Sequence, residues 1–382
     1  MTAARGITMT VLAGPSVPKP LLPATVDLLE SVEITEAMEG RSGFQLVFGA
    51  SRGSPFDLID YPLLKERSLA PWSRVVVLVT FNAVPTVLID GLITRQELQP
   101  SQGDGSARLV LTGEDLSVAM DREAKTAAHP AQSENVIASK IILSYGRYGI
   151  LPQVMPPPVI VVPPPTQRMP MQHDTDLGYL LTMAARFGYV FQVRPGRVPL
   201  SNIAYWGPPR LIGLPQPALT VAMSGETNVD SISFRTDALA AAATAGQIMD
   251  PATNKASSIA VTKASWPALG RTPALQAWGS DGRQALLDGA EGLTYAQARA
   301  LAQGRTDSSS QRTMIAEGEL DALAYGNILR AAGLVGVRGV GRTYDGDYYV
   351  AEVTHQLARG SFRQKFRLNR GGIAALKPLV RP

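Results

Sequence analysis

The sequence predicts a mainly β protein with α+β parts: two small β-barrel domains, an α/β middle domain and an inserted segment. Charged residues make up only 18% of the 382 residues, below the usual share of about 25%, and there are 35 glycines and 29 prolines. A hydrophobic content of 45% is enough to build the cores of two or three domains. Short strand-like runs recur about every ten positions between turn-forming residues, which is typical of small barrels and sandwiches.

The first barrel is expected over residues 25–121. Its strand-like runs either alternate apolar with polar residues or are rich in β-branched residues, and they cover residues 32–35, 44–48, 73–80, 85–94 and 106–112. The fourth of these runs can break at Asp90-Gly91. Residues 1–24 contain several prolines and little periodicity, so we expect them to form a flexible N-terminal arm.

The middle domain, residues 122–215, is expected to be α/β. Ser133 can cap a helix whose apolar residues recur with helical spacing, at Val136, Ile137, Ile141 and Ile142. Eight of the twenty residues in 151–170 are proline, which predicts an extended strap. A second helix should begin at Asp174 or Thr175 and end before Gly188, and a strand should follow over residues 189–193.

The second barrel is expected in two pieces, residues 216–237 and 311–370. The insertion between them, residues 238–310, is rich in alanine, glycine and serine and predicts one helix. That helix should begin at the capping-box pattern of Thr294 and Gln297, and Gly304 can end it. Residues 371–382 form a C-terminal tail.

A hairpin over residues 349–368 is the strongest such pattern in the chain. Its second strand alternates apolar residues with Arg363, Lys365 and Arg367, so one face is expected to be apolar and the other basic. The basic face is either a solvated strand face or a contact with an anionic partner or the lumen of a ring. The candidate interaction residues are Arg363, Lys365, Arg367, Arg370, Lys377 and Arg381.

The composition excludes several classes of function. The absence of cysteine excludes disulfide scaffolds and thiolate sites, and three histidines far apart in sequence provide little for a metal centre. We therefore expect no metal and no cofactor. No apolar run approaches the length of a membrane span, and a net charge of +4 without a basic tract argues against nucleic-acid binding.

One catalytic motif is present, at Gly49-Ala-Ser-Arg-Gly53, and it leaves a serine hydrolase using Ser51 as a remote alternative. The motif needs a helix directly after it, but Pro55 and Pro62 leave little room for one, so a turn is favoured. Three weaker patterns are better explained by turns and helix caps: His173–Asp176, Gly336–Gly341 and Asp345–Asp347. We expect that the protein is not an enzyme.

Several segments, taken in order, resemble the phage late control protein D family, the baseplate hub of contractile tails. The valine-glycine-repeat spike proteins of type VI secretion and the hubs of extracellular contractile injection systems share this hub. The resemblance lies in segments that include Gly113-Glu-Asp-Leu-Ser-Val-Ala-Met-Asp-Arg122, residues 133–146, residues 172–191, Tyr344-Asp-Gly-Asp-Tyr-Tyr-Val-Ala-Glu-Val-Thr-His355 and residues 362–370.

The resemblance implies a homotrimer in which two similar barrels per chain make a pseudo-sixfold ring. Such a ring adapts the sixfold inner tail tube to the threefold spike. The implied partners are further copies of this chain, inner tube or tube-initiator proteins, the spike and baseplate wedge components. The implied location is a phage virion or phage-like injection particle assembled in the bacterial cytoplasm.

The sequence departs from the members that are fused to a spike. Because the chain stops at Pro382, a separate trimeric spike protein is expected, and residues 371–382 should point toward it. Binding to nucleic acid or insertion into a membrane is not expected. The alternative to a contractile-tail hub is a tail-tip or adhesin-type binding module of a non-contractile tail.

Overall fold

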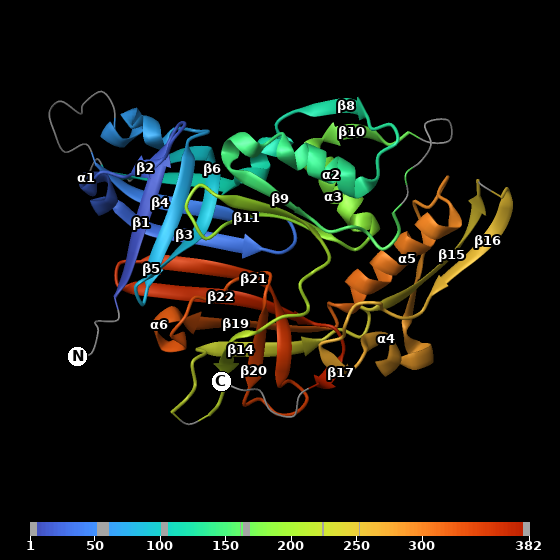
Figure 1. The fold of residues 1–382 in the computed structure, drawn as a ribbon. Helices are drawn as coiled ribbons and strands as arrows, with labels where there is room; N and C mark the ends of the chain where they lie inside the picture. Colours follow the sequence, from blue (N-terminus) through green and yellow to red (C-terminus); the bar gives the residue numbers. More distant parts are fainter. Residues whose placement is uncertain are drawn as a thin grey trace.

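The computed structural model describes residues 6–376 apart from 52–60, 101–105, 161, 163–168, 224 and 252. The fold is mainly β, with one large sheet, several small sheets and a few helices (Figure 1). The short helical elements are α1 (Pro23–Asp27), η2 (Pro62–Lys65), η3 (Arg67–Leu69), η4 (Leu116–Asp121), η5 (Gly146–Tyr148), α4 (Ala274–Ala277), η6 (Gly279–Asp281) and α6 (Ala322–Tyr325).

The large sheet has 13 strands and contains the strands of both expected barrels. In order across the sheet, eleven of them are β14 (Ser231–Thr236), β19 (Met314–Asp321), β22 (Ser361–Arg370), β21 (Gly346–Ala358), β3 (Leu29–Ala37), β4 (Gly43–Ser51), β7 (Ser106–Asp115), β6 (Val84–Pro100), β5 (Arg74–Phe81), β1 (Ile7–Gly14) and β2 (Lys19–Pro20). The remaining two strands branch from β21: β20 (Leu334–Arg338) and its parallel neighbour β13 (Gln216–Thr220).

The two halves of this sheet meet where β3 pairs with β21. The pairing is antiparallel and in register from Ser31 opposite Ala358 to Ala37 opposite Glu352. We call this pairing the seam. Among the described residues, the strand pairing closes neither half into a barrel, so the expectation of two separate barrels is replaced by one continuous sheet. The pattern within each strand could not show this, because the seam joins segments more than 300 positions apart.

The core of the first half extends across the seam. Val32, Ile34, Leu46 and Phe48 lie on the inward face of their strands and are at most 1% exposed. Four residues of the second half belong to the same buried cluster: Ala322, Ile328, Leu357 and Phe362. Apolar contact therefore holds the two halves together in addition to the backbone hydrogen bonds of the seam.

The N-terminal segment differs from the flexible arm that was expected over residues 1–24. Ile7–Gly14 forms β1, and eight of its residues pair with β5. Val11 and Ala13 are buried in the first core, and Pro15 and Pro18 fall in the turn before β2. The backbone pairing of β1 with β5 is thus compatible with the prolines, because none of them lies within β1.

A three-stranded sheet with helices on one side forms the middle of the chain. Its order is β11 (Val190–Pro195), β12 (Asn202–Gly207) and β9 (Ile150–Val154), and α2 (Glu134–Leu143) and α3 (Asp176–Arg186) share a buried cluster with it. The ribbon of β8 (Ala124–Ala128) and β10 (Met171–Thr175) leads into α3. The expected cap of α3 is confirmed, since the Thr175 hydroxyl accepts a hydrogen bond from the Gly178 N–H, and Gly188 follows the helix with φ of 68°.

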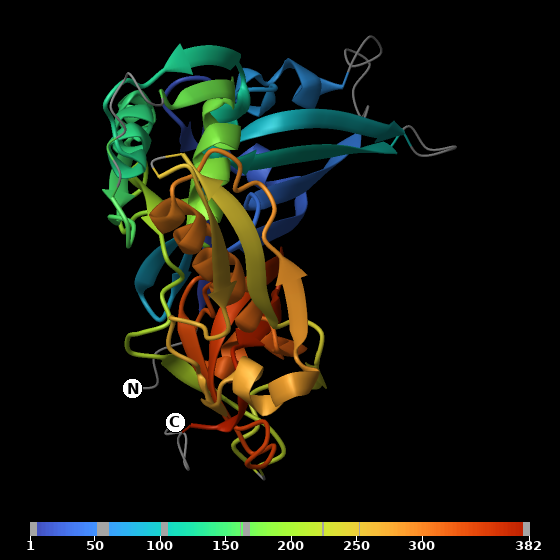
Figure 2. The ribbon, with the colours of Figure 1, turned by 90° about the vertical axis from the view of Figure 1, so that its right-hand side faces the viewer.

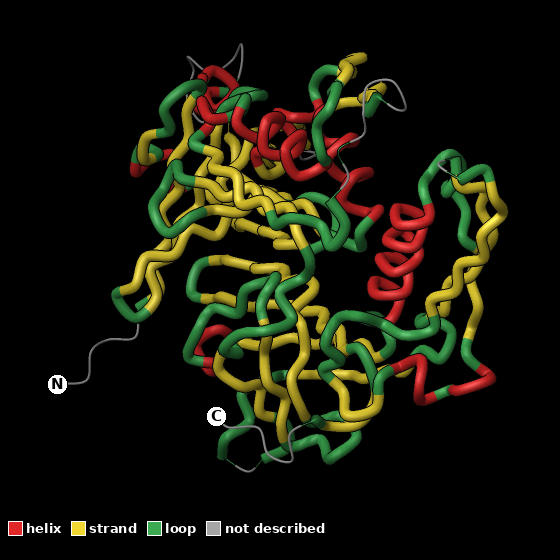
Figure 3. The backbone as a smooth tube through the Cα atoms, turned by 45° about the vertical axis from the view of Figure 1, so that its right-hand side comes forward, coloured by secondary structure: helices red, strands yellow, loops and turns green. Residues whose placement is uncertain are grey.

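Residues 238–310 form more than the single helix that was expected. They build a sheet in the order β16 (Lys255–Val261), β15 (Ala242–Asp250) and β18 (Arg283–Leu286), and α5 (Tyr295–Ser310) covers it. Figure 3 shows α5 alongside the strands of this unit. We call it the inserted unit. Its β17 (Gly270–Thr272) pairs with β23 (Ile373–Ala375) near the C-terminus. Alanine and serine carry little strand signal, which is why this sheet was not predicted.

The predicted start of α5 is confirmed and its predicted end is wrong. The Thr294 and Gln297 side chains form a reciprocal capping box, but the helix continues through Gly304 to Ser310. Gly304 instead marks a close contact with the end of α3. A Cβ added to it would lie 2.5 Å from both the Gly188 nitrogen and the Phe187 carbonyl carbon. The two glycines let the backbones of the inserted unit and the middle domain touch.

The β6–β7 hairpin extends away from the rest of the sheet, as Figure 2 shows. β6 runs unbroken through Asp90-Gly91, where the sequence allowed a break, and a register shift lies between Ile93 and Arg95. Gly91 is required inside this long strand, since a Cβ there would meet the Glu114 carbonyl oxygen at 2.1 Å. The strand therefore bends around its neighbour without ending.

We predict that Gly304→Ala lowers the free energy of unfolding by about 1–3 kcal/mol, because the added methyl group forces the α3–α5 contact apart. Helix propensity alone predicts a gain of about 1 kcal/mol for the same change. Urea unfolding of the two proteins measures the difference. Arg299→Ala is the matched control, because Arg299 is exposed on the same helix. A Gly304→Ala protein at least as stable as the parent contradicts the contact.

Candidate interaction surfaces

The face of β22 that was expected to be basic is a ladder of both charges. Arg363 lies 3.1 Å from a Glu319 carboxylate oxygen on β19, and Arg367 lies 3.0 Å from a Glu352 carboxylate oxygen on β21. Lys365 stands opposite Glu319 in the strand register. Because both neighbouring strands contribute acids, this face differs from the expected basic surface. The alternation along one strand cannot show which charges the adjacent strands bring.

Arg370 lies inside the protein and is not part of this face. Its side chain is fully buried, and its guanidinium stacks 4.7 Å from the centre of the Tyr348 ring. It donates hydrogen bonds to three backbone carbonyls of the loop between β20 and β21, those of Thr343, Tyr344 and Asp345. Arg370 therefore holds this loop against the end of the sheet. The expectation that Arg370 is a surface interaction residue is corrected, because its side chain is buried.

The other two basic candidates, Lys377 and Arg381, lie outside the described residues. The described tail before them ends in β23, which pairs with β17 of the inserted unit. Residues 371–376 are thus attached to the inserted unit, an arrangement that the sequence did not predict.

A buried polar cluster lies at the seam and was not identified from the sequence as a unit. The His355 ring is fully buried on β21, and its Nε2 lies 3.1 Å from a Glu36 carboxylate oxygen on β3. The Gln364 amide NH₂ donates to His355 Nδ1 at 2.9 Å. The same NH₂ donates to the Leu329 carbonyl oxygen, and the Gln364 amide oxygen accepts from the Leu329 N–H. Since an amide NH₂ can only donate, Nδ1 is the acceptor, and Nε2 carries the proton that His355 donates to Glu36.

Glu36 is the acidic centre of this seam cluster. The Arg330 Nε lies 2.6 Å from one of its oxygens, and the Ala331 N–H donates to the other at 3.1 Å. Burial alone would raise the pKa of Glu36, but the charge of Arg330 and the contacts with His355 outweigh it and lower the pKa to about 2. The carboxylate is therefore ionised, and both of its oxygens have partners within the seam cluster.

Two residues of the seam cluster, Glu36 and Gln364, are polar residues at inward positions of strands, a pattern that is visible in the sequence. Glu36 continues the inward alternation of Val32 and Ile34, and Gln364 falls between the inward residues Phe362 and Phe366. A polar residue at an inward strand position indicates a buried partner, because an unpaired one is costly. The partner itself could not be identified, since Glu36 and His355 are 319 positions apart.

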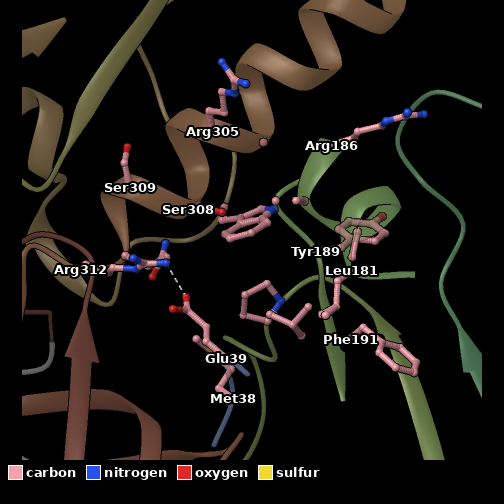
Figure 4. A pocket seen from close by; sticks show the side chains of 18 of the residues that line it. Met38, Glu39, Leu181, Arg186, Tyr189, Phe191, Arg305, Ser308, Ser309 and Arg312 are labelled. Carbon is pink, nitrogen blue, oxygen red and sulfur yellow. Dashed lines mark hydrogen bonds and ion pairs between the residues drawn. The ribbon is translucent and has the colours of Figure 1, made fainter. Parts of the chain in front are cut away.

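A large cleft of about 1100 Å³ lies between α3, α5 and the turn at residues 38–40. Figure 4 shows Leu181, Tyr189 and Phe191 of the middle domain on one side of it and residues of α5 on the other. Its three lining arginines pair with acids: Arg312 with Glu39 at 2.6 Å, Arg305 with Asp288, and Arg186 with Glu134 at 3.9 Å. Three acids line the cleft as well: Glu39, Asp237 and Glu291. This balance provides no net charge for recognising a ligand.

The alternative motifs provide no assembled active site in the described residues. Ser51 is the last residue of β4 and pairs with Ser106, and Arg52 and Gly53 of its motif lie outside the described residues. His173 lies on the β8–β10 ribbon, and Asp176 begins α3 and pairs with Lys125 at 2.7 Å. Asp345 accepts a hydrogen bond from the Val340 N–H in the turn before β21.

The described residues also hold neither a metal-ligand cluster nor a helix able to span a membrane. No group of three or more histidine, aspartate or glutamate side chains is placed there as metal ligands would be. Among the helices formed by these same residues, none has the length and apolar character needed to cross a membrane.

We predict that Arg370→Met lowers the free energy of unfolding by about 1–3 kcal/mol, because it removes the hydrogen bonds that the buried guanidinium donates to three loop carbonyls. The matched change on the same strand, Arg367→Met, removes a half-exposed ion pair and should cost less than about 1 kcal/mol. Urea unfolding of both variants provides the comparison. Equal effects of the two changes would show that Arg370 does not hold the loop.

We predict a pH dependence from Glu36, whose pKa is lower in the folded protein than the ordinary 4.5. A lowered carboxyl pKa stabilises the fold above the unfolded-state pKa, and the stabilisation is lost as the pH falls through the folded value. The stability difference between the parent and Glu36→Gln should therefore be full at pH 6 and shrink between about pH 4.5 and 2. Glu33→Gln, on the exposed face of the same strand, is the control and should show little difference at any pH. A difference for Glu36→Gln that stays constant with pH contradicts the ionised seam cluster.

Comparison with known proteins gives the fold of the chain. No protein-family model matches the sequence, and no curated protein is similar to it. Among solved structures, the tail protein of Neisseria meningitidis MC58 matches with a TM-score of 0.64 at 12% identity, over 96% of this chain and 97% of that one. The 43 kDa tail protein of prophage MuSo2 from Shewanella oneidensis matches with a TM-score of 0.60 at 12% identity, over 95% and 96%.

A third match is the E. coli c3393 protein, a component of the type VI secretion system. It has a TM-score of 0.54 at 13% identity, over 93% of this chain and 77% of that one. The order of strands and helices along nearly the whole chain is thus shared with proteins of tails and of type VI secretion. The chain has the fold of these tail proteins.

Proposed function

We propose that this chain is a structural baseplate hub of a contractile phage tail or a phage-like injection system. It adapts a sixfold inner tail tube to a threefold spike as a homotrimeric ring. The observation that carries the proposal is the fold shared with two tail proteins over at least 95% of each chain. Similarity over the whole chain means that the inserted unit and the middle domain belong to the shared architecture.

The sheet also supports this role. Apart from the parallel pair β13–β20, the strands of its two halves are antiparallel, and the seam joins the halves side by side, so one chain presents two strand-rich units to a ring. Three copies would then present six such units, which is the symmetry match that a sixfold tube requires. The partners in this proposal are the inner tube or tube-initiator proteins, a trimeric spike and baseplate wedge components.

The edges of the sheet are suited to assembly. β14 pairs on one side only, with β19, and β1 and β2 end the path on the other side. An edge strand exposes unpaired backbone donors and acceptors, and proteins usually cover such edges. In a ring, neighbouring copies or tube subunits cover them.

We predict that the purified full chain forms a trimer, that is, three copies of the 40.7 kDa chain, visible as a ring with six similar lobes. Native mass spectrometry gives the copy number, and electron microscopy of the same sample gives the symmetry. When tube and spike proteins of such a system are added, they should bind to opposite faces of the ring. A chain that stays monomeric at micromolar concentration and binds neither protein contradicts the proposal.

A further inference from the structure

A second cavity, of about 620 Å³, lies at the junction of the two halves of the sheet and the middle domain. Its walls come from the first part of β6, the end of β3, the end of β11 and the residues that precede β20. Three arginines line it: Arg194 at the end of β11, Arg197 in the turn that follows, and Arg330. Val84, Pro85 and Ile203 supply an apolar part of the wall.

Arg194 has no acidic partner among the described residues. No carboxylate in the described part of the chain lies within ion-pair distance of its guanidinium, and its Nε is buried without a hydrogen-bond acceptor. Burial lowers the pKa of Arg194, and the nearby charges of Arg210 and Arg330 lower it further. A partly buried cation that lies beside other cations, and whose Nε has no acceptor, is costly to the fold.

The two acids that line this cavity cannot neutralise Arg194. Glu36 already accepts from His355 and Ala331 and pairs with Arg330. Asp115 accepts from the backbone N–H groups of Ser42 and Ser117, each at 2.8 Å. Both carboxylates are therefore used within the fold, and neither is available to pair with Arg194.

We propose that this cavity binds an oxyanion, a carboxylate or phosphate carried on a small organic group, with Arg194 as its principal donor. A planar guanidinium pairs with either group through two parallel hydrogen bonds, and Arg197 at the exposed rim adds a second cation. The apolar wall accommodates the organic part, as in ligand cavities that combine a few polar groups with apolar surface. The anion comes either from a free small molecule or from an acidic side chain of an assembly partner. This proposal does not depend on the hub function.

The test is calorimetric titration of the full chain with citrate and with a tetraglutamate peptide, each at ionic strength matched with sodium chloride. We expect saturable binding of citrate or the peptide. Arg194→Met should weaken it at least about tenfold, since a charge-assisted pair is lost. Arg194→Lys keeps the charge and should retain part of the affinity. The stronger of the two ligands identifies the source of the anion.

Two further variants keep the test decisive. Arg197 lies at the exposed rim, so the Arg197→Gln protein should fold normally even if the Arg194→Met protein does not. The Arg197→Gln change should also weaken binding. Arg95→Gln, exposed on β6 outside the cavity, is the control and should bind as the parent does. The proposal is overturned if neither citrate nor the peptide binds, or if the Arg197→Gln and Arg95→Gln proteins bind equally well.

Discussion

The architecture depends on the seam, the antiparallel pairing of β3 with β21. It joins residues 31–37 to residues 352–358 and so makes one sheet out of two groups of strands. Its backbone hydrogen bonds are supplemented by a core that crosses it and by the buried contact of Glu36 with His355. Removing one member of such a buried pair leaves the other without a partner, which makes the pairing specific as well as stable.

The other units are placed relative to this sheet. Arg330 reaches Glu36 from the segment before β20, so the seam cluster also fixes the floor of the arginine-lined cavity. The inserted unit leaves after β14 and returns at β19, two neighbouring strands, and contacts the middle domain through Gly188 and Gly304. Both cavities therefore lie where units meet, which is where ligand sites commonly occur. A rigid connection of this kind suits the proposed role, in which the protein joins two larger assemblies of different symmetry.

Much of the local structure could be predicted from the sequence, because its signals are local. The cap at Thr175, the glycine after α3 and the two-residue turn at Arg359-Gly360 each follow from a few neighbouring residues. The long-range features could not be predicted in the same way. The acids that pair with Arg363 and Arg367 come from other strands. The loop carbonyls to which Arg370 donates are brought to it only by the fold. The strands of the inserted unit were missed because alanine and serine do not distinguish strand from loop.

The central claim is that the seam makes the two halves one cooperative body. Hydrogen exchange of the backbone amides in the full chain tests it most directly. If the claim holds, amides of β3 and β21 exchange as slowly as those of β5 in the first half and β22 in the second, and all of them are released in a single unfolding event. Faster exchange of the β3 amides that face β21, with the interiors of both halves still protected, would contradict it and would show two separate units that merely touch.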